Sequence, residues 1–158
     1  MSKLNSVVDK ILDAGLALSV AIVFVVTFLQ VISRFVFKLG IPWSTDIIRL
    51  AFVYTVFLGA ALGMREKGHL NVDVVFNALP ERTRNIVGIG INMLLLGFFV
   101  FLFVLGMQFT QTGLTQGAPY VQMPMSVYYF SVPLSALLMF YYLIQHMVEQ
   151  FKQLKAKS

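Results

Sequence analysis

Few side chains in this sequence could do chemistry, and the two most informative ones lie close together. Asp46 and Arg49 are three residues apart in a mainly apolar segment, so in a helix they would share one face. A charge inside an apolar helix is costly unless it is paired or reaches water. Two interpretations stay open: a local ion pair, with Trp43 anchoring the helix at an interface, or a docking site for a partner subunit. We favour the ion pair.

The two histidines do not form a plausible cofactor site. Bis-histidine ligation of haem needs two rings at one depth on facing helices. His69 lies in a charged segment after Gly68, and His146 ends an apolar segment. We expect His69 to be a surface or interface residue. The sequence has no Cys, which excludes disulfides, thiolate metal sites and cysteine nucleophiles. We therefore predict no cofactor, no metal and no enzymatic activity.

The elements that carry these residues are membrane helices. Hydrophobic residues make up 58% of the chain, against about 45–50% in soluble domains. Residues 14–33 and 85–145 contain no Asp, Glu, Lys or Arg, and one bilayer crossing needs about 20 apolar residues. The first run is also longer than the apolar core of a signal peptide. We predict a single all-α membrane domain over residues 1–158, with transmembrane helices at about 12–33, 45–64, 85–109 and 126–146.

Several residues predict local features of these helices. Pro42 suits a helix start, Ser44 or Thr45 could cap it, and Pro133 should kink the last helix. Between the second and third helices, apolar residues at helical spacing within 65–85 predict a short amphipathic helix at the membrane surface.

Small residues recur every four positions along the second helix and end at Gly59 and Gly63. Such a stripe permits close helix packing, either within this subunit or against another one.

The helix centres lack the groups that ion-coupled transport normally uses. Transporters usually keep a carboxylate or a broken helix near mid-membrane, but the central two-thirds of all four predicted helices have no ionisable residue. Their polar residues, Gln30, Asn92 and Gln108, are expected to make hydrogen bonds between helices. The chain alone is therefore not expected to move a solute.

The basic residues predict orientation in the membrane. With four crossings, nine of the twelve Lys and Arg residues fall on the side of both termini, and three, Arg34, Lys38 and Arg49, fall on the other. The positive-inside rule then places both termini in the cytoplasm. Because these charges lie in short segments beside apolar runs, they indicate membrane lipids as partners and no nucleic acid.

Four segments carry a family resemblance: residues 34–37 (RFVF), 42–49 (PWSTDIIR), 57–61 (FLGAA) and 69–73 (HLNVD). Together with the length and the four predicted helices, they resemble the small membrane subunit of TRAP transporters, the DctQ-like family. The family usually has Glu where this chain has Asp46, so the charge is kept with a shorter reach.

This resemblance implies a sodium-coupled, tripartite transporter of the bacterial inner membrane. In it, a periplasmic binding protein captures an organic acid, such as a C4-dicarboxylate or sialic acid, and a large membrane subunit transports it. The small subunit would scaffold the large one and help dock the binding protein. Alternatives are the membrane anchor of a redox enzyme and a small channel-like assembly. The candidate interface residues are Arg34, Trp43, Asp46, Arg49, Gly59, Gly63, His69 and Asp73.

Overall fold

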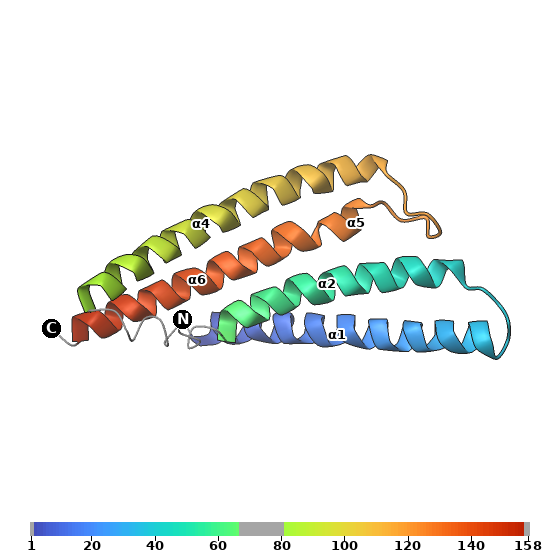
Figure 1. Ribbon diagram of the computed structural model, residues 1–158, viewed down its shortest axis with the longest axis horizontal. Coiled ribbons are helices and arrows are strands. Elements are labelled where there is room, and N and C mark those ends of the chain that lie inside the picture. The colour runs from blue at the N-terminus through green and yellow to red at the C-terminus, as the bar shows by residue number, and fades with distance from the viewer. Residues whose placement is uncertain (1, 67–80, 157–158) are drawn as a thin grey trace.

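The computed structural model describes residues 2–66 and 81–156, which are almost entirely helical (Figure 1). Four helices are long and apolar enough to cross a membrane, as predicted. Most of the predicted amphipathic helix at 65–85 lies outside the described residues. The helices are α1 (Ser2–Phe35), α2 (Pro42–Glu66), α4 (Glu81–Thr112), the short 3-10 helix η1 (Gly113–Thr115), α5 (Ser126–Tyr129) and α6 (Ser131–Ala156).

The helices extend beyond the predicted spans because polar turns continue them past the apolar stretch. α1 begins at Ser2 instead of residue 12, and α6 continues to Ala156 instead of residue 146. Pro42 starts α2, as predicted. The predicted cap at Ser44 or Thr45 is wrong, because α2 begins at Pro42 and both residues lie inside its first turn. The Ser44 hydroxyl instead donates back to the carbonyl of Ile41 at 2.6 Å.

Pro133 explains the break between α5 and α6. Proline has no N–H and its ring clashes with the carbonyl four residues earlier, which here belongs to Tyr129. The two helices are separated at Phe130, so the predicted irregularity is present about one turn before the proline. Leu134 N still donates to Phe130 O at 3.2 Å across the break.

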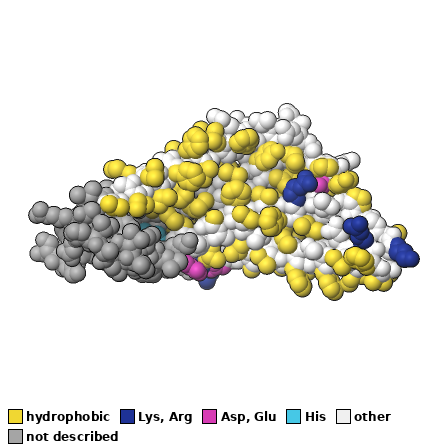
Figure 2. Space-filling view, in the orientation of Figure 1, with side chains coloured by type: hydrophobic (Ala, Val, Ile, Leu, Met, Phe, Trp, Pro, Cys, Tyr) yellow, Lys and Arg dark blue, Asp and Glu magenta, His cyan; other side chains and the backbone are white. Residues whose placement is uncertain are grey.

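The four long helices form a row in the order α1, α2, α6, α4 (Figure 1). Within the apolar span of α6, 44% of the residues are buried, against 6% in α1. Such a row covers α6 on two sides and leaves α1 packed mainly along α2. Figure 2 shows the consequence: apolar side chains cover much of the visible surface. This surface suits lipid or other membrane helices as its surroundings.

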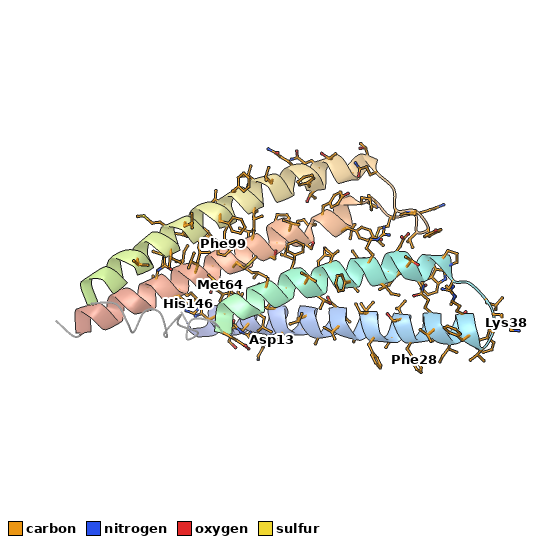
Figure 3. All side chains as sticks on the ribbon, in the orientation of Figure 1. Asp13, Phe28, Lys38, Met64, Phe99 and His146 are labelled. Atoms are coloured by element: carbon orange, nitrogen blue, oxygen red, sulfur yellow. The ribbon has the colours of Figure 1, made fainter. Side chains whose placement is uncertain are left out.

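The core lies toward the end of the row that holds both termini. Leu12 of α1, Leu58 of α2 and Phe99 of α4 belong to one buried cluster with α6, and Figure 3 labels Phe99 on the side of α4 that faces α6. Toward the opposite end, the α4–α6 pair inclines away from the α1–α2 pair (Figure 1). There Tyr54 of α2 bridges the two pairs, donating its hydroxyl to Val127 O at 3.0 Å.

Glycine allows two close backbone approaches. At the crossing of α4 and α6, a Cβ placed on Gly106 would lie 2.8 Å from Pro133 Cδ and 2.9 Å from Pro133 N. Between η1 and α5, a Cβ on Gly113 would lie 2.6 Å from Ser126 N. Membrane helices associate through such small residues because their backbones can then approach closely.

Polar side chains in the spans are satisfied mostly by their own helices. Ser19 donates to Gly15 O at 2.8 Å, and Ser135 donates to Val132 O at 2.9 Å, which is a common way to satisfy a hydroxyl in lipid. The predicted interhelical bonds of the side chains of Gln30, Asn92 and Gln108 are absent among the hydrogen bonds of the described residues. The described bonds between helices come instead mainly from tyrosines, including Tyr54, Tyr141 and Tyr142.

Candidate partner interface

Asp46 is buried and holds a distant loop. Only 1% of its surface is exposed. Its Oδ2 accepts hydrogen bonds from the backbone N–H groups of Tyr120 at 2.7 Å and Val121 at 3.0 Å. Hydrogen bonds to a charged acceptor are stronger than neutral ones. The carboxylate therefore ties the second turn of α2 to the segment between η1 and α5.

That segment is itself ordered as a hairpin, which we define as residues 116–125. Ala118 N donates to Met123 O at 2.9 Å, and Met125 N donates to Gln116 O at 2.8 Å. Gly117 and Pro124 form an antiparallel bridge. The Tyr128 hydroxyl also donates to the backbone carbonyl of Asp46 at 3.2 Å. The hairpin tip and the start of α5 are thus both bound to α2.

The expected ion pair between Asp46 and Arg49 is not formed. The ion pairs of the described residues all involve Arg65, and Arg49 is exposed. The physical reason is that the two backbone N–H groups satisfy one carboxylate oxygen inside the protein, whereas Arg49 can extend into solvent. The other oxygen, Oδ1, is buried and has no partner among the described residues.

The other candidates at this end of the row lie at the turn from α1 to α2. Arg34 is in the last turn of α1 and Trp43 is 48% exposed at the start of α2. Between them Lys38 adopts a left-handed φ of 55°, and Figure 3 places it at the tip of the turn. Ser33 closes the turn by donating its hydroxyl to Leu39 O at 3.0 Å.

The small-residue stripe does not make the closest contact within this chain. A Cβ on Gly59 would lie 4.0 Å from Leu16 Cδ1, and a Cβ on Gly63 would meet nothing within 4 Å. His69 and Asp73 lie outside the described residues. The structure therefore brings Asp46 together with the hairpin, places Arg34 and Arg49 at the same end of the row, and leaves the side of Gly63 open.

A second polar cluster lies at the opposite end of the row, and the sequence analysis missed it. Arg65 Nη1 of α2 lies 2.9 Å from Asp13 Oδ1 and 3.9 Å from Asp9 Oδ1, both on α1. From α6, the Tyr142 hydroxyl donates to Asp9 Oδ1 at 2.8 Å. Acidic residues two to three turns into α1 and two tyrosines in the middle of α6 were a possible signal, but their pairing depends on the tertiary fold.

Two further bonds strengthen this end. The Tyr141 hydroxyl donates to Asn5 Oδ1 at 2.8 Å, and His146 Nε2 lies 3.0 Å from Met64 O. Figure 3 shows His146 and Met64 close together where α6 and α2 meet. Across residues 2–66 and 81–156, no group of three or more His, Asp or Glu side chains is arranged to hold a metal ion.

Removing the Tyr142 hydroxyl tests how much this polar cluster contributes to the stability of the fold. Replacing Tyr142 with Phe is expected to lower the free energy of unfolding by about 1.5–3 kcal/mol, because the lost bond has a charged acceptor and Tyr142 is only 2% exposed. Tyr120→Phe, at a tyrosine that is 61% exposed, is the matched control and should change stability by less than about 0.5 kcal/mol. Thermal unfolding in detergent measures both, and equal losses would contradict the assignment.

These features define a multi-pass membrane protein whose ion pairs and buried carboxylate lie near the two ends of its helices. A family model for the DctQ component of tripartite ATP-independent periplasmic transporters matches residues 23–153. The chain belongs to this family and is a small permease subunit of a TRAP transporter, not an enzyme.

Similar proteins agree over most of the chain. A Haemophilus influenzae protein named as a TRAP transporter small permease protein is 30% identical over 151 residues, covering 96% of this chain and 92% of that protein. The C4-dicarboxylate TRAP transporter small permease protein DctQ of Vibrio cholerae is 26% identical over 119 residues, covering 75% of this chain and 51% of that protein.

Proposed function

We propose that this subunit scaffolds the large membrane subunit of a sodium-coupled, binding-protein-dependent transporter of organic acids, and that it helps dock the periplasmic binding protein. The transporter works in the bacterial inner membrane. In this proposal the large subunit carries the substrate and sodium sites. The small subunit supplies a fixed set of helices beside it, because its own helix centres have no ionisable residue.

The observation that carries the proposal is the open helix row. A row with only 6% of the α1 span buried leaves broad apolar faces for another membrane protein. Longer relatives support the same partnership. The isethionate TRAP transporter permease protein DctMQ of Oleidesulfovibrio alaskensis aligns with 84% of this chain but with only 22% of its own length. A segment similar to this chain therefore occurs inside a much longer permease.

The candidate interface residues have different parts in this proposal. Gly59 and Gly63 offer a small-residue face of α2 to a helix of the large subunit. Arg34, Trp43, Asp46 and Arg49 lie at the outer end, where a periplasmic protein approaches. His69 and Asp73 are proposed contacts from the sequence alone.

The substrate is proposed as a C4-dicarboxylate or sialic acid. Relatives with those substrates in their names include the Vibrio cholerae proteins DctQ and SiaQ. The described residues of this chain supply no charged site at mid-membrane that would select among organic acids, so the choice belongs to the other two components.

Reconstituted transport tests the scaffold function. Liposomes that contain this subunit alone, the large subunit alone, or both are given the binding protein, an inward sodium gradient and either labelled succinate or labelled sialic acid. Uptake is expected only when both subunits are present, because neither the substrate site nor the scaffold suffices alone. Robust uptake by this chain alone would contradict the proposal.

Labelling of introduced cysteines tests the orientation, in which both termini are cytoplasmic. The chain has no native Cys, so single cysteines at Lys3, Gly117 and Lys155 report their side without background. An impermeant thiol reagent applied to intact cells should label only the Gly117 variant, and permeabilised cells should label all three. The reverse pattern would place the hairpin in the cytoplasm and overturn this orientation.

A further inference from the structure

We propose that the hairpin and the α1–α2 turn form a cationic docking face for a soluble protein with an acidic surface, and that Asp46 is the positioning residue of this face. The inference rests on the proposed function, since it requires this end of the row to lie on the periplasmic side of the membrane. It adds that the partner presents an acidic surface, and that exposed cations at this end attract that surface.

The charges at this end are uneven in a way that favours an acidic partner. Arg34, Lys38 and Arg49 are all exposed. The single carboxylate nearby, Asp46, is 1% exposed and is bound by backbone N–H groups of the hairpin. Figure 2 shows Lys and Arg side chains at the end of the molecule remote from the grey residues, with only a small patch of acidic atoms beside them. Such a face attracts acidic surfaces over a distance of about 10 Å at ordinary salt.

The hairpin distinguishes this face from a simple set of lipid anchors. Cations at a helix end can bind phospholipid headgroups without any ordered loop. Here residues 116–125 lie outside the apolar spans, which end at Thr115 and resume at Ser126. The loop is nevertheless fixed by its own backbone bonds and by a buried carboxylate. A fixed loop with an exposed tyrosine, Tyr120, at the same end of the row as two exposed arginines has the composition that protein interfaces favour.

Asp46 connects the two parts of the face. By accepting from Tyr120 and Val121, its carboxylate holds the hairpin tip against α2. The same bonds take the carboxylate away from Arg49, which then keeps its charge for a partner. Losing Asp46 should therefore disturb the shape of the face, whereas losing Arg49 should disturb only its charge.

The test uses the complex of the small and large subunits in nanodiscs of neutral phosphatidylcholine, with the transporter's own binding protein as the soluble ligand. Arg49→Glu, Arg34→Glu and Lys38→Glu should each slow association, by up to about tenfold at low salt, and the effect should shrink as salt is added. Lys10→Glu, at an exposed cation on the opposite end of α1, is the matched control and should associate at the wild-type rate.

The positioning role of Asp46 has its own readout. Asp46→Ala should slow association several-fold at high salt as well as at low salt, because the hairpin is released. Asp46→Asn should recover most of the rate, because an amide oxygen can still accept from the two N–H groups. A merely structural role would lower the yield of complex without this salt-independent change and its rescue. If Asp46→Ala does not fold, the exposed-residue variants still decide the matter.

Each result has a fixed meaning. Wild-type association rates in all three charge reversals would overturn the docking face while leaving the scaffold function intact. The same measurement is repeated in nanodiscs that contain phosphatidylglycerol. If the charge reversals slow association only there, the cations act through lipid headgroups and the docking face is overturned. Failure of the wild-type subunits to co-purify would reject the scaffold function, and the docking face with it.

Discussion

Adding a single methyl group at Gly106 is expected to lower the free energy of unfolding by about 1–3 kcal/mol, the usual cost of overpacking. The Cβ of Gly106→Ala would lie 2.8 Å from Pro133 Cδ and 2.9 Å from Pro133 N. The backbone nitrogen of a proline cannot rotate away as a flexible side chain could. The helices α4 and α6 would have to separate, and their packing along the core would weaken.

The matched control for Gly106 is on the same helix. A Cβ on Gly97 would meet nothing within 4 Å, so Gly97→Ala should leave stability unchanged or raise it by up to about 1 kcal/mol through helix propensity. Thermal unfolding in detergent, followed by size-exclusion chromatography, compares the two variants. Similar melting temperatures for both would show that the α4–α6 crossing is not as close as the structure has it.

Replacing Asp46 with Ala is expected to lower the free energy of unfolding nearly as much as Gly106→Ala does, whereas replacing Arg49 with Ala should hardly change it. Asp46→Ala leaves the N–H groups of Tyr120 and Val121 without their acceptor. Each donor that stays buried without a partner costs about 1–3 kcal/mol. The loss is smaller where water reaches the loop, which lies at the end of the helices.

The comparison with Arg49 separates the two interpretations of this pair. If Arg49 neutralised Asp46, Arg49→Ala would leave a buried carboxylate unpaired and would cost about 3–5 kcal/mol. Because Arg49 is exposed and forms no ion pair with another described residue, Arg49→Ala should change stability by less than about 0.5 kcal/mol. Thermal unfolding measures both, and hydrogen exchange at the hairpin should increase only in Asp46→Ala.

The sequence alone predicted the membrane spans well, because the signal is one-dimensional. The lengths of the uncharged runs, set against the thickness of a bilayer, give four crossings, and the structure has four candidate spans at nearly those positions. Pro42 at the start of α2 and the irregularity caused by Pro133 were also predictable. Both follow from the missing N–H of proline, which acts within a few residues of chain.

The helix ends were harder to predict. Hydropathy reports where a helix leaves the lipid, and nothing requires the helix to end there. α1 therefore extends through Asn5 and Asp9, which were expected to precede it. These residues bind Tyr141 and Tyr142 of α6, and only the folded arrangement brings them together.

The main features of the candidate site were decided by the tertiary structure. The four-residue spacing of Gly59 and Gly63 indicated a close crossing, yet the close approaches are at Gly106 and Gly113, which have no such pattern. Similarly, spacing along one helix favoured Arg49 as the partner of Asp46. The actual partners are backbone N–H groups 74 and 75 residues away. Every residue except proline has such a group, so its identity leaves no mark in the sequence, and only the packing of the hairpin against α2 determines which two of them Asp46 binds.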